Sequence, residues 1–93
     1  MPDGRAVPQL TRLRLTLYSR PGCHLCDDMK AVVDRVAARV PLSLEVVNID
    51  DDAALTARYG LEIPVLLVEG RKMAKYRIEE AVLERTLRAH ATA

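Results

Sequence analysis

An alternation of apolar and polar residues is the first regular pattern in the chain. Leu13, Leu15 and Leu17 alternate with charged and polar residues. A period of two is typical of a β-strand that buries one face. The next stretch, Ser19-Arg-Pro-Gly22, contains a proline and a glycine, which interrupt regular structure. The pattern therefore predicts a strand that ends near residue 18.

A helical spacing replaces the alternation a few residues later. Apolar residues then recur three or four positions apart, at Leu25, Met29, Val32, Val33, Val36 and Val40. This is the spacing of one apolar helix face, and most of the intervening charged residues fall on the other side. Pro41 should end the helix, because a proline ring disfavours the helical conformation in the residue before it.

Five further elements are predicted downstream. The patterns indicate a strand over 42–49, a short helix over 53–59, a buried strand over 65–68, a returning strand over 71–77 and a last helix over 79–89. In the last helix, Val82, Leu83 and Leu87 should face inward. The dipeptide Glu69-Gly70 predicts a tight hairpin turn between the third and fourth strands.

The order of these elements, β-α-β-α-β-β-α, predicts an α/β fold. A strand–helix–strand crossover places its two strands in parallel, and the hairpin adds antiparallel strands. The result is one four-stranded mixed sheet with helices on both faces. We assign this domain to residues 12–90. Residues 1–11 contain two prolines, a glycine and no sustained periodicity, and we expect them to form a flexible N-terminal arm.

Composition narrows the possible partners of this single small domain. The 93 residues carry 14 basic and 13 acidic side chains and only three aromatic ones, all tyrosines. A nucleic-acid-binding protein usually has a basic excess and, for single strands, stacking aromatic residues, so we expect no nucleic-acid partner. The longest apolar run is Val65–Val68, and the N-terminus has no apolar stretch typical of a signal peptide. We expect a cytoplasmic monomer without a membrane partner.

The two cysteines, Cys23 and Cys26, carry the candidate chemistry. A disulfide between them would close almost no loop and so would constrain the unfolded chain little. In a chain without a secretion signal, such a pair is more typical of catalysis or metal binding. The pair lies where the first strand gives way to the first helix, and the unpaired N–H groups and dipole of a helix N-terminus stabilise a thiolate. We interpret Cys23, at the entry, as the nucleophile and Cys26, one turn further in, as the resolving thiol.

Two neighbours of the pair are candidate substrate-binding residues. Arg20 adds a positive charge three residues before Cys23. His24 would favour the thiolate when charged and accept a proton when neutral, and we prefer an exposed histidine that tunes the redox potential. Two other functions stay open: a metal or iron–sulfur cluster carrier using the two cysteines, and a binding module without turnover. The chain has no second cysteine pair to complete a tetrahedral zinc site.

Two stretches of the chain resemble the thioredoxin superfamily, and within it a glutaredoxin-like domain. They are Leu17-Tyr-Ser-Arg-Pro-Gly-Cys-His-Leu-Cys26 and Tyr59-Gly-Leu-Glu-Ile-Pro-Val65, and the resemblance extends over residues 12–90. It is closest to short glutaredoxin-like proteins whose cellular roles are undefined. The resemblance implies a thioredoxin-like fold with a cis peptide bond before Pro64 and this proline facing the cysteine pair. It also implies that the backbone of Ile63 pairs with an extended substrate.

The chain departs from glutaredoxins where they bind glutathione. Glutaredoxins commonly have Pro-Tyr between the cysteines, Thr-Val-Pro before the third strand and a glycine pair before the last helix. Here the corresponding stretches are His24-Leu25, Glu62-Ile-Pro64 and Lys75-Tyr-Arg-Ile-Glu-Glu80. Acidic Glu62, Glu79 and Glu80 would repel the carboxylates of glutathione.

The substrates and the electron donor follow from the resemblance and from these departures. The resemblance implies a dithiol–disulfide oxidoreductase acting on a disulfide-containing protein or a glutathione-mixed disulfide. Its reductant would be glutathione or a thioredoxin-reductase type of enzyme. Glutathione is a possible co-substrate, and we expect no tightly bound cofactor and no metal. The departures predict weak use of glutathione and a preference for the dithiol reaction.

Overall fold

The computed structural model describes residues 12–92, with side chains to residue 90. The elements are β1 (Leu13–Ser19), α2 (His24–Ala37), β2 (Leu42–Asn48), the 3₁₀ helix η2 (Ile49–Asp51), α3 (Ala53–Tyr59), β3 (Val65–Val68), β4 (Arg71–Lys75) and α4 (Glu80–Thr92). This order confirms the predicted β-α-β-α-β-β-α arrangement, with η2 as an addition. The predicted arm over residues 1–11 lies outside the described residues.

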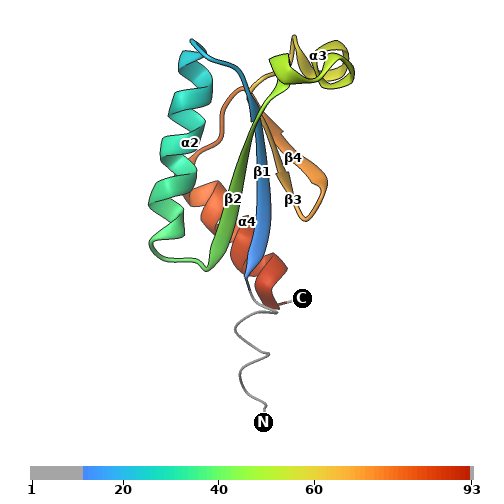
Figure 1. Ribbon diagram of the computed structural model, residues 1–93. Coiled ribbons are helices and arrows are strands. Elements are labelled where there is room, and N and C mark those ends of the chain that lie inside the picture. Colours follow the sequence, from blue (N-terminus) through green and yellow to red (C-terminus); the bar gives the residue numbers. More distant parts are fainter. Residues whose placement is uncertain (1–11, 93) are drawn as a thin grey trace.

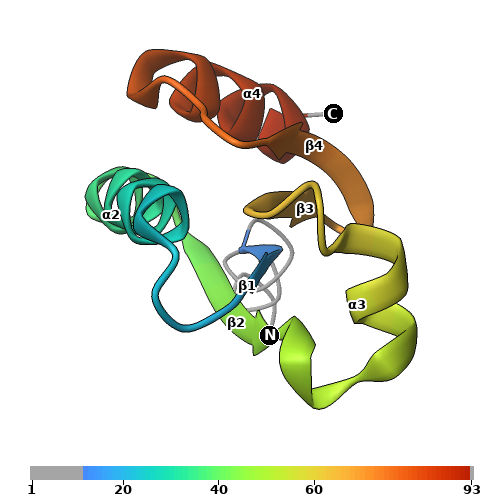
Figure 2. The same cartoon turned by 90° about the horizontal axis from the view of Figure 1, so that it is seen from above.

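The four strands form one mixed sheet in the order β2-β1-β3-β4. β1 runs parallel to β2, with Leu13 opposite Leu42, and antiparallel to β3, with Tyr18 opposite Val65. β3 and β4 form an antiparallel hairpin. Seen from above, α2 and α4 lie on one side of the sheet and α3 lies on the other (Figure 2). The fold is therefore thioredoxin-like, with helices on both faces as predicted.

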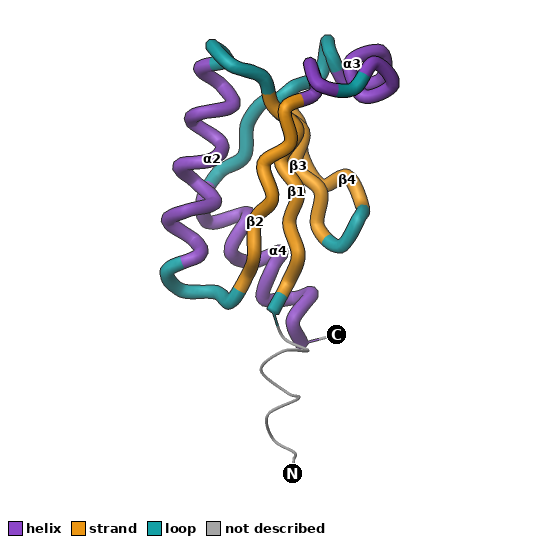
Figure 3. Tube along the Cα trace, in the orientation of Figure 1, coloured by secondary structure: helices purple, strands orange, loops and turns teal. Residues whose placement is uncertain are grey.

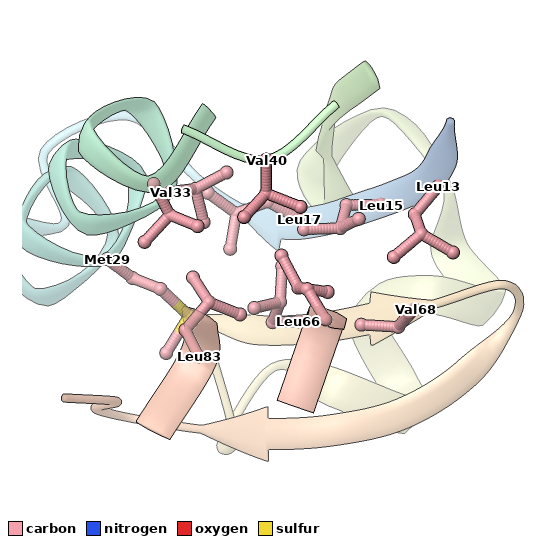
Figure 4. Packing of buried hydrophobic residues seen from close by; sticks show 11 residues of the cluster. Leu13, Leu15, Leu17, Met29, Val33, Val40, Leu66, Val68 and Leu83 are labelled. Atoms are coloured by element: carbon pink, nitrogen blue, oxygen red, sulfur yellow. The ribbon is translucent and has the colours of Figure 1, made fainter. Parts of the chain in front are cut away.

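The main core lies between the sheet and the helices α2 and α4 (Figure 4). The alternating leucines of β1 point into it, and none of the three is more than 6% exposed. Leu83 and Leu87 of α4 are completely buried, as predicted. Val82 is 37% exposed, so its predicted inward position is wrong. Leu83 and Leu87 are four residues apart and share one helix face, and Val82 is turned away from it.

A smaller apolar cluster covers the opposite face of the sheet. Tyr59 of α3 packs there with Val65 and Leu67 of β3. The ring of Tyr59 also stacks on the ring of Tyr18, with 4.7 Å between the ring centroids. The four residues of β3 are buried because their side chains alternate between the two clusters. This explains why β3 has a continuous apolar sequence rather than an alternating one.

Two elements end at least two residues earlier than the sequence patterns predicted. Helix α2 ends at Ala37, because the N–H groups of Ala38 and Arg39 bond to carbonyls three residues back and tighten the last turn. Strand β4 ends at Lys75 rather than at residue 77. The next residue, Tyr76, has φ 69°, a left-handed conformation that cannot continue a strand.

The hairpin between β3 and β4 has two irregular features. Its turn residues Glu69 and Gly70 have φ values of 51° and 82°, so both central positions are left-handed, as in the type I′ turn that suits a two-residue hairpin. The pairing register also shifts by one residue between Leu66 and Leu67, because Leu66 pairs with Ala74 and Leu67 pairs with Lys72. Met73 is thus an extra residue in β4, and the strand contains a bulge.

The two halves of the fold bring the predicted site residues to one end of the sheet. The beginning of α2, the short helix α3 and the segment after β4 all lie at that end (Figure 1). Loops make most of the connections there (Figure 3). Among the described residues, no helix is long and apolar enough to cross a membrane.

Candidate functional site

The two cysteines are joined by a disulfide bond at the beginning of α2. Cys23 is the N-cap residue, and its Sγ accepts a hydrogen bond of 3.1 Å from the backbone N–H of Cys26. The two Cα atoms are 5.2 Å apart, inside the range that a disulfide requires. Cys26 is 3% exposed, and Cys23 is partly exposed. The two cysteines are therefore close enough to be joined, and Cys23 is the more exposed of the pair.

The turn that leads from β1 into α2 depends on Gly22. Its φ is 81°, a left-handed conformation that costs most other residues energy and glycine very little. The turn lets the chain reverse direction before Cys23, which has extended backbone angles of −92° and 106°. An extended N-cap residue directs its side chain toward the first N–H groups of the helix. The local sequence thus places a sulfur atom on the positive end of α2.

Arg20, the cation that was expected to act on the cysteines, is held in an ion pair with another residue. The guanidinium of Arg20 donates two hydrogen bonds, of 3.1 and 2.9 Å, to one carboxylate oxygen of Asp50 in η2. This ion pair compensates much of the charge of Arg20 toward the cysteines. His24 is exposed at the first position of α2. No local sequence pattern points to Asp50, because the pairing depends on the parallel register that brings the end of β2 beside the end of β1.

The segment before β3 contains a residue, Ile63, whose backbone groups are not hydrogen-bonded within the described part of the chain. The Ile63–Pro64 peptide bond is cis, as the resemblance implied, and Pro64 is buried. The carbonyl of Pro64 accepts a hydrogen bond of 2.8 Å from the N–H of Tyr76. Within the described part of the chain, the N–H and carbonyl of Ile63 make no hydrogen bond. Ile63 therefore has a donor and an acceptor available for a binding partner.

The acidic residues that were expected to repel glutathione are partly neutralised. A hydrogen bond from Lys72, 2.9 Å long, lowers the pKa of Glu62. Hydrogen bonds from Arg35 and Arg39 lower the pKa of Glu80. Both carboxylates are thus held in ion pairs, and only Glu79 of the three lacks a side-chain partner among the described residues.

A groove of about 450 Å³ opens between α2 and the segment that follows β4. Its lining residues are Leu25, Asp28, Met29, Val32, Tyr76, Arg77, Ile78 and Glu79. Leu25 lies between the two cysteines in the sequence, so the groove begins in the first turn of α2, and neither cysteine is among its lining residues. In the sequence pattern, Leu25, Met29 and Val32 belong to the apolar face of the helix, and this pattern gives no sign of the groove.

Tyr76 is the most unusual residue of this region. Its φ of 69° is left-handed, its side chain is 41% exposed, and its hydroxyl donates a hydrogen bond of 2.9 Å to the carbonyl of Leu61. The absence of a glycine pair from this stretch is the available sequence signal, but it does not by itself single out Tyr76 as a site residue.

Metal-ligating side chains are not gathered into a metal site within the region described. Residues 12–90 contain no group of three or more His, Cys, Asp or Glu side chains arranged to hold a metal ion. The dithiol itself offers two sulfur ligands.

Comparison with known families shows which family the chain belongs to. The model of the Glutaredoxin-like domain (DUF836) matches residues 14–88. The chain belongs to this glutaredoxin-like family. The X-ray structure of the structural genomics target XcR50 from X. campestris is 39% identical to it, with a TM-score of 0.69, and the match covers 81% of this chain and 96% of that one.

Two further solved structures show how widely the fold is shared. Protein Ne2328 from Nitrosomonas europaea is 32% identical, with a TM-score of 0.71, over 81% of this chain and 91% of that one. A mutant thioredoxin from Halobacterium salinarum is 18% identical, with a TM-score of 0.65, over 96% and 86% of the two chains. The thioredoxin match supports the fold alone. A glutaredoxin-like domain with a Cys-x-x-Cys pair at disulfide distance fits a redox function.

Proposed function

We propose that this glutaredoxin-like protein is a cytoplasmic dithiol–disulfide oxidoreductase that reduces protein disulfides. The observation that carries the proposal is the position of Cys23 as N-cap of α2, with its partly exposed sulfur 3.1 Å from the N–H of Cys26. In the reduced protein, the same N–H group and the helix dipole would stabilise a thiolate on Cys23. The buried Cys26 would remain a thiol until the second step.

The reaction balances as a two-electron exchange. The Cys23 thiolate attacks one sulfur of the substrate disulfide, the substrate S–S bond breaks, and the first substrate sulfur leaves as a thiolate that takes up a proton. Cys26 then loses its proton and attacks the sulfur of Cys23, which releases the second substrate sulfur as a thiol. The substrate gains two electrons and two protons, and the protein is left with the Cys23–Cys26 disulfide. Two electrons from glutathione or a thioredoxin-reductase type of enzyme restore the dithiol.

The backbone of Ile63 is the proposed docking point for an extended substrate. Its unpaired N–H and carbonyl could form two hydrogen bonds to a peptide chain, in the manner of an added strand. Glutathione finds little charge complementarity here, because Arg20 is paired with Asp50. Arg77 is an exposed cation of the groove without a side-chain partner among the described residues, but Asp28 and Glu79 in the same lining also lack one, so the groove, like glutathione, carries a net negative charge. We therefore propose that glutathione is a poor substrate and that the dithiol reaction dominates.

Two cysteine variants test the proposal. Cys23→Ser should abolish turnover, because no thiolate remains to attack. Cys26→Ser should accumulate a mixed disulfide with a protein substrate, because the second step is lost. Both variants are assayed with a protein disulfide and with a glutathione-mixed disulfide, and the trapped adduct is identified by mass spectrometry. Near-full activity of Cys26→Ser with the glutathione substrate would contradict the dithiol mechanism and indicate a one-cysteine reaction.

A further inference from the structure

The backbone of Tyr76 is held in a conformation that a bulky residue seldom adopts. A φ of 69° is left-handed, where a side chain with a Cβ crowds the backbone. Such strain persists only where the surroundings enforce it, and strained residues are concentrated at functional sites. Tyr76 follows β4 directly and lines the groove between this segment and α2.

Two hydrogen bonds connect Tyr76 to the segment before β3. The backbone N–H of Tyr76 donates to the carbonyl of Pro64 at 2.8 Å, and its hydroxyl donates to the carbonyl of Leu61 at 2.9 Å. Leu61 and Pro64 lie on either side of Ile63, whose own N–H and carbonyl are unpaired among the described residues. Tyr76 thus holds both ends of the short segment that carries the proposed docking point.

The same residue is one of those that line the groove, and Lys75 Nζ lies 5.4 Å from the centroid of its ring. The other apolar lining residues are Leu25, Met29, Val32 and Ile78. Asp28, Arg77 and Glu79 complete the lining and have no side-chain partner within the described part of the chain. An aliphatic side chain would gain from leaving water there. Asp28, Arg77 and Glu79 give the groove a net negative charge, and glutathione, with two carboxylates and one ammonium, is also net negative, so its binding there is disfavoured.

We propose that Tyr76 determines substrate specificity: it shapes the groove to receive an aliphatic side chain near the reacting cysteine of an extended protein substrate. This inference rests on the proposed function, because the groove selects among substrates that Cys23 attacks. The hydroxyl and the ring of Tyr76 contribute to this role in different ways. Its hydroxyl positions the segment around Ile63, and its ring provides the apolar wall.

The test uses peptides that differ in one residue. Each short peptide contains one cysteine, linked through a disulfide to the same leaving thiol, and carries either leucine or serine at each position within three residues of the cysteine. With the wild-type protein, kcat/KM should be roughly tenfold higher for leucine than for serine at one or more positions, the discrimination expected when a few methylene groups are buried. A glutathione disulfide with the same leaving thiol is measured alongside.

Three variants separate the hydroxyl from the ring. Tyr76→Phe keeps the ring, so the leucine preference should persist while KM rises several-fold for both peptides. Tyr76→Gly removes the wall and relieves the left-handed strain, so the leucine preference should fall to within about twofold and the glutathione rate should rise. Leu25→Ser, which alters another part of the groove lining, should also lower the preference.

Glu69→Gly is the matched control. Glu69 is the other non-glycine residue with a left-handed φ among those described, and it lies in the hairpin turn, at the opposite end of β3 from Pro64. This variant relieves backbone strain without changing the groove, so its leucine preference should equal that of the wild type. A loss of preference in this control as large as in Tyr76→Gly would refute a local role for Tyr76.

The two proposals fail in different ways. Equal kcat/KM for all leucine and serine peptides, with turnover intact, would overturn the role of Tyr76 and leave the oxidoreductase function standing. No turnover of any disulfide by the wild-type protein would overturn the proposed function itself. If Tyr76→Gly were too unstable to assay, an unchanged leucine preference in Leu25→Ser would by itself refute the groove.

Discussion

The sulfur of Cys23 has a structural role that can be measured apart from its chemistry. As the N-cap of α2, it accepts a hydrogen bond from the N–H of Cys26. Cys23→Ser replaces the sulfur with a hydroxyl oxygen, which is a strong cap, whereas Cys23→Ala removes the acceptor. Both variants lack the disulfide and the nucleophile, so the difference between them isolates the cap. Loss of an N-cap acceptor costs about 1 kcal/mol in the free energy of unfolding.

This difference should reach the stability of the whole domain, because α2 contributes Met29, Val33 and Val36 to the main core. For a domain of this size, 1 kcal/mol corresponds to roughly 4–8 °C in Tm. The alanine variant should therefore unfold at a lower temperature than the serine variant.

Urea denaturation under reducing conditions measures the same difference. The urea midpoint should be lower for Cys23→Ala than for Cys23→Ser, with equal m values if the unfolded states expose the same surface. Neither variant should turn over a disulfide substrate, so activity does not distinguish them. Equal midpoints would refute the reasoning, because they would mean that a hydrogen-bond acceptor at the N-cap of α2 does not contribute to the stability of the domain.

Two further predictions concern charged groups. Hydrogen bonds from Arg35 and Arg39 lower the pKa of Glu80 in the folded protein. The Glu80 carboxylate therefore stabilises the folded state at pH values above its unfolded pKa near 4.5. This stabilisation is lost as the pH falls through the lower pKa of the folded state. Glu80→Gln should therefore lower Tm at pH 7 and reduce the loss of Tm between pH 7 and pH 3; an unchanged pH dependence would contradict this. Asp50→Asn should release Arg20 from its ion pair and raise kcat/KM for a glutathione-mixed disulfide roughly two- to fivefold, the scale of an exposed ion pair, with little change in Tm. No change in that rate constant would show that the charge of Arg20 does not act on the substrate.

The parts of the fold that were predictable depend on neighbours in the sequence. The alternating leucines of β1 and the spacing of α2 each reveal a buried face within a dozen residues. The turn at Glu69-Gly70 is similarly local, because its backbone conformation suits a glycine at the second position. The position of Cys23 at the helix entry followed from the change of period between these elements.

The parts that were not predictable depend on contacts between distant segments. The pairing of Arg20 with Asp50 joins residues thirty positions apart and requires the parallel register of β1 and β2. The left-handed backbone of Tyr76 opposes the intrinsic preference of a bulky residue, so no local pattern predicts it. Its hydroxyl contact with Leu61 and the groove beside it are consequences of that conformation.

The pairing of residues in the β3–β4 hairpin determines which side chain lies at the site. Pro64 and Tyr76 lie at the two ends of this hairpin, so the number of residues between them sets which side chain is opposite the segment before β3. The bulge at Met73 uses one residue more in β4 than in β3. If the same residues paired without the bulge, Leu66 would pair with Met73 and Val65 with Ala74, and Lys75 would lie where Tyr76 now lies, with an ammonium group in place of the phenol ring. Deletion of Met73 would remove the bulge and keep Tyr76 in place, whereas loss of the bulge without a deletion would exchange one kind of wall for another.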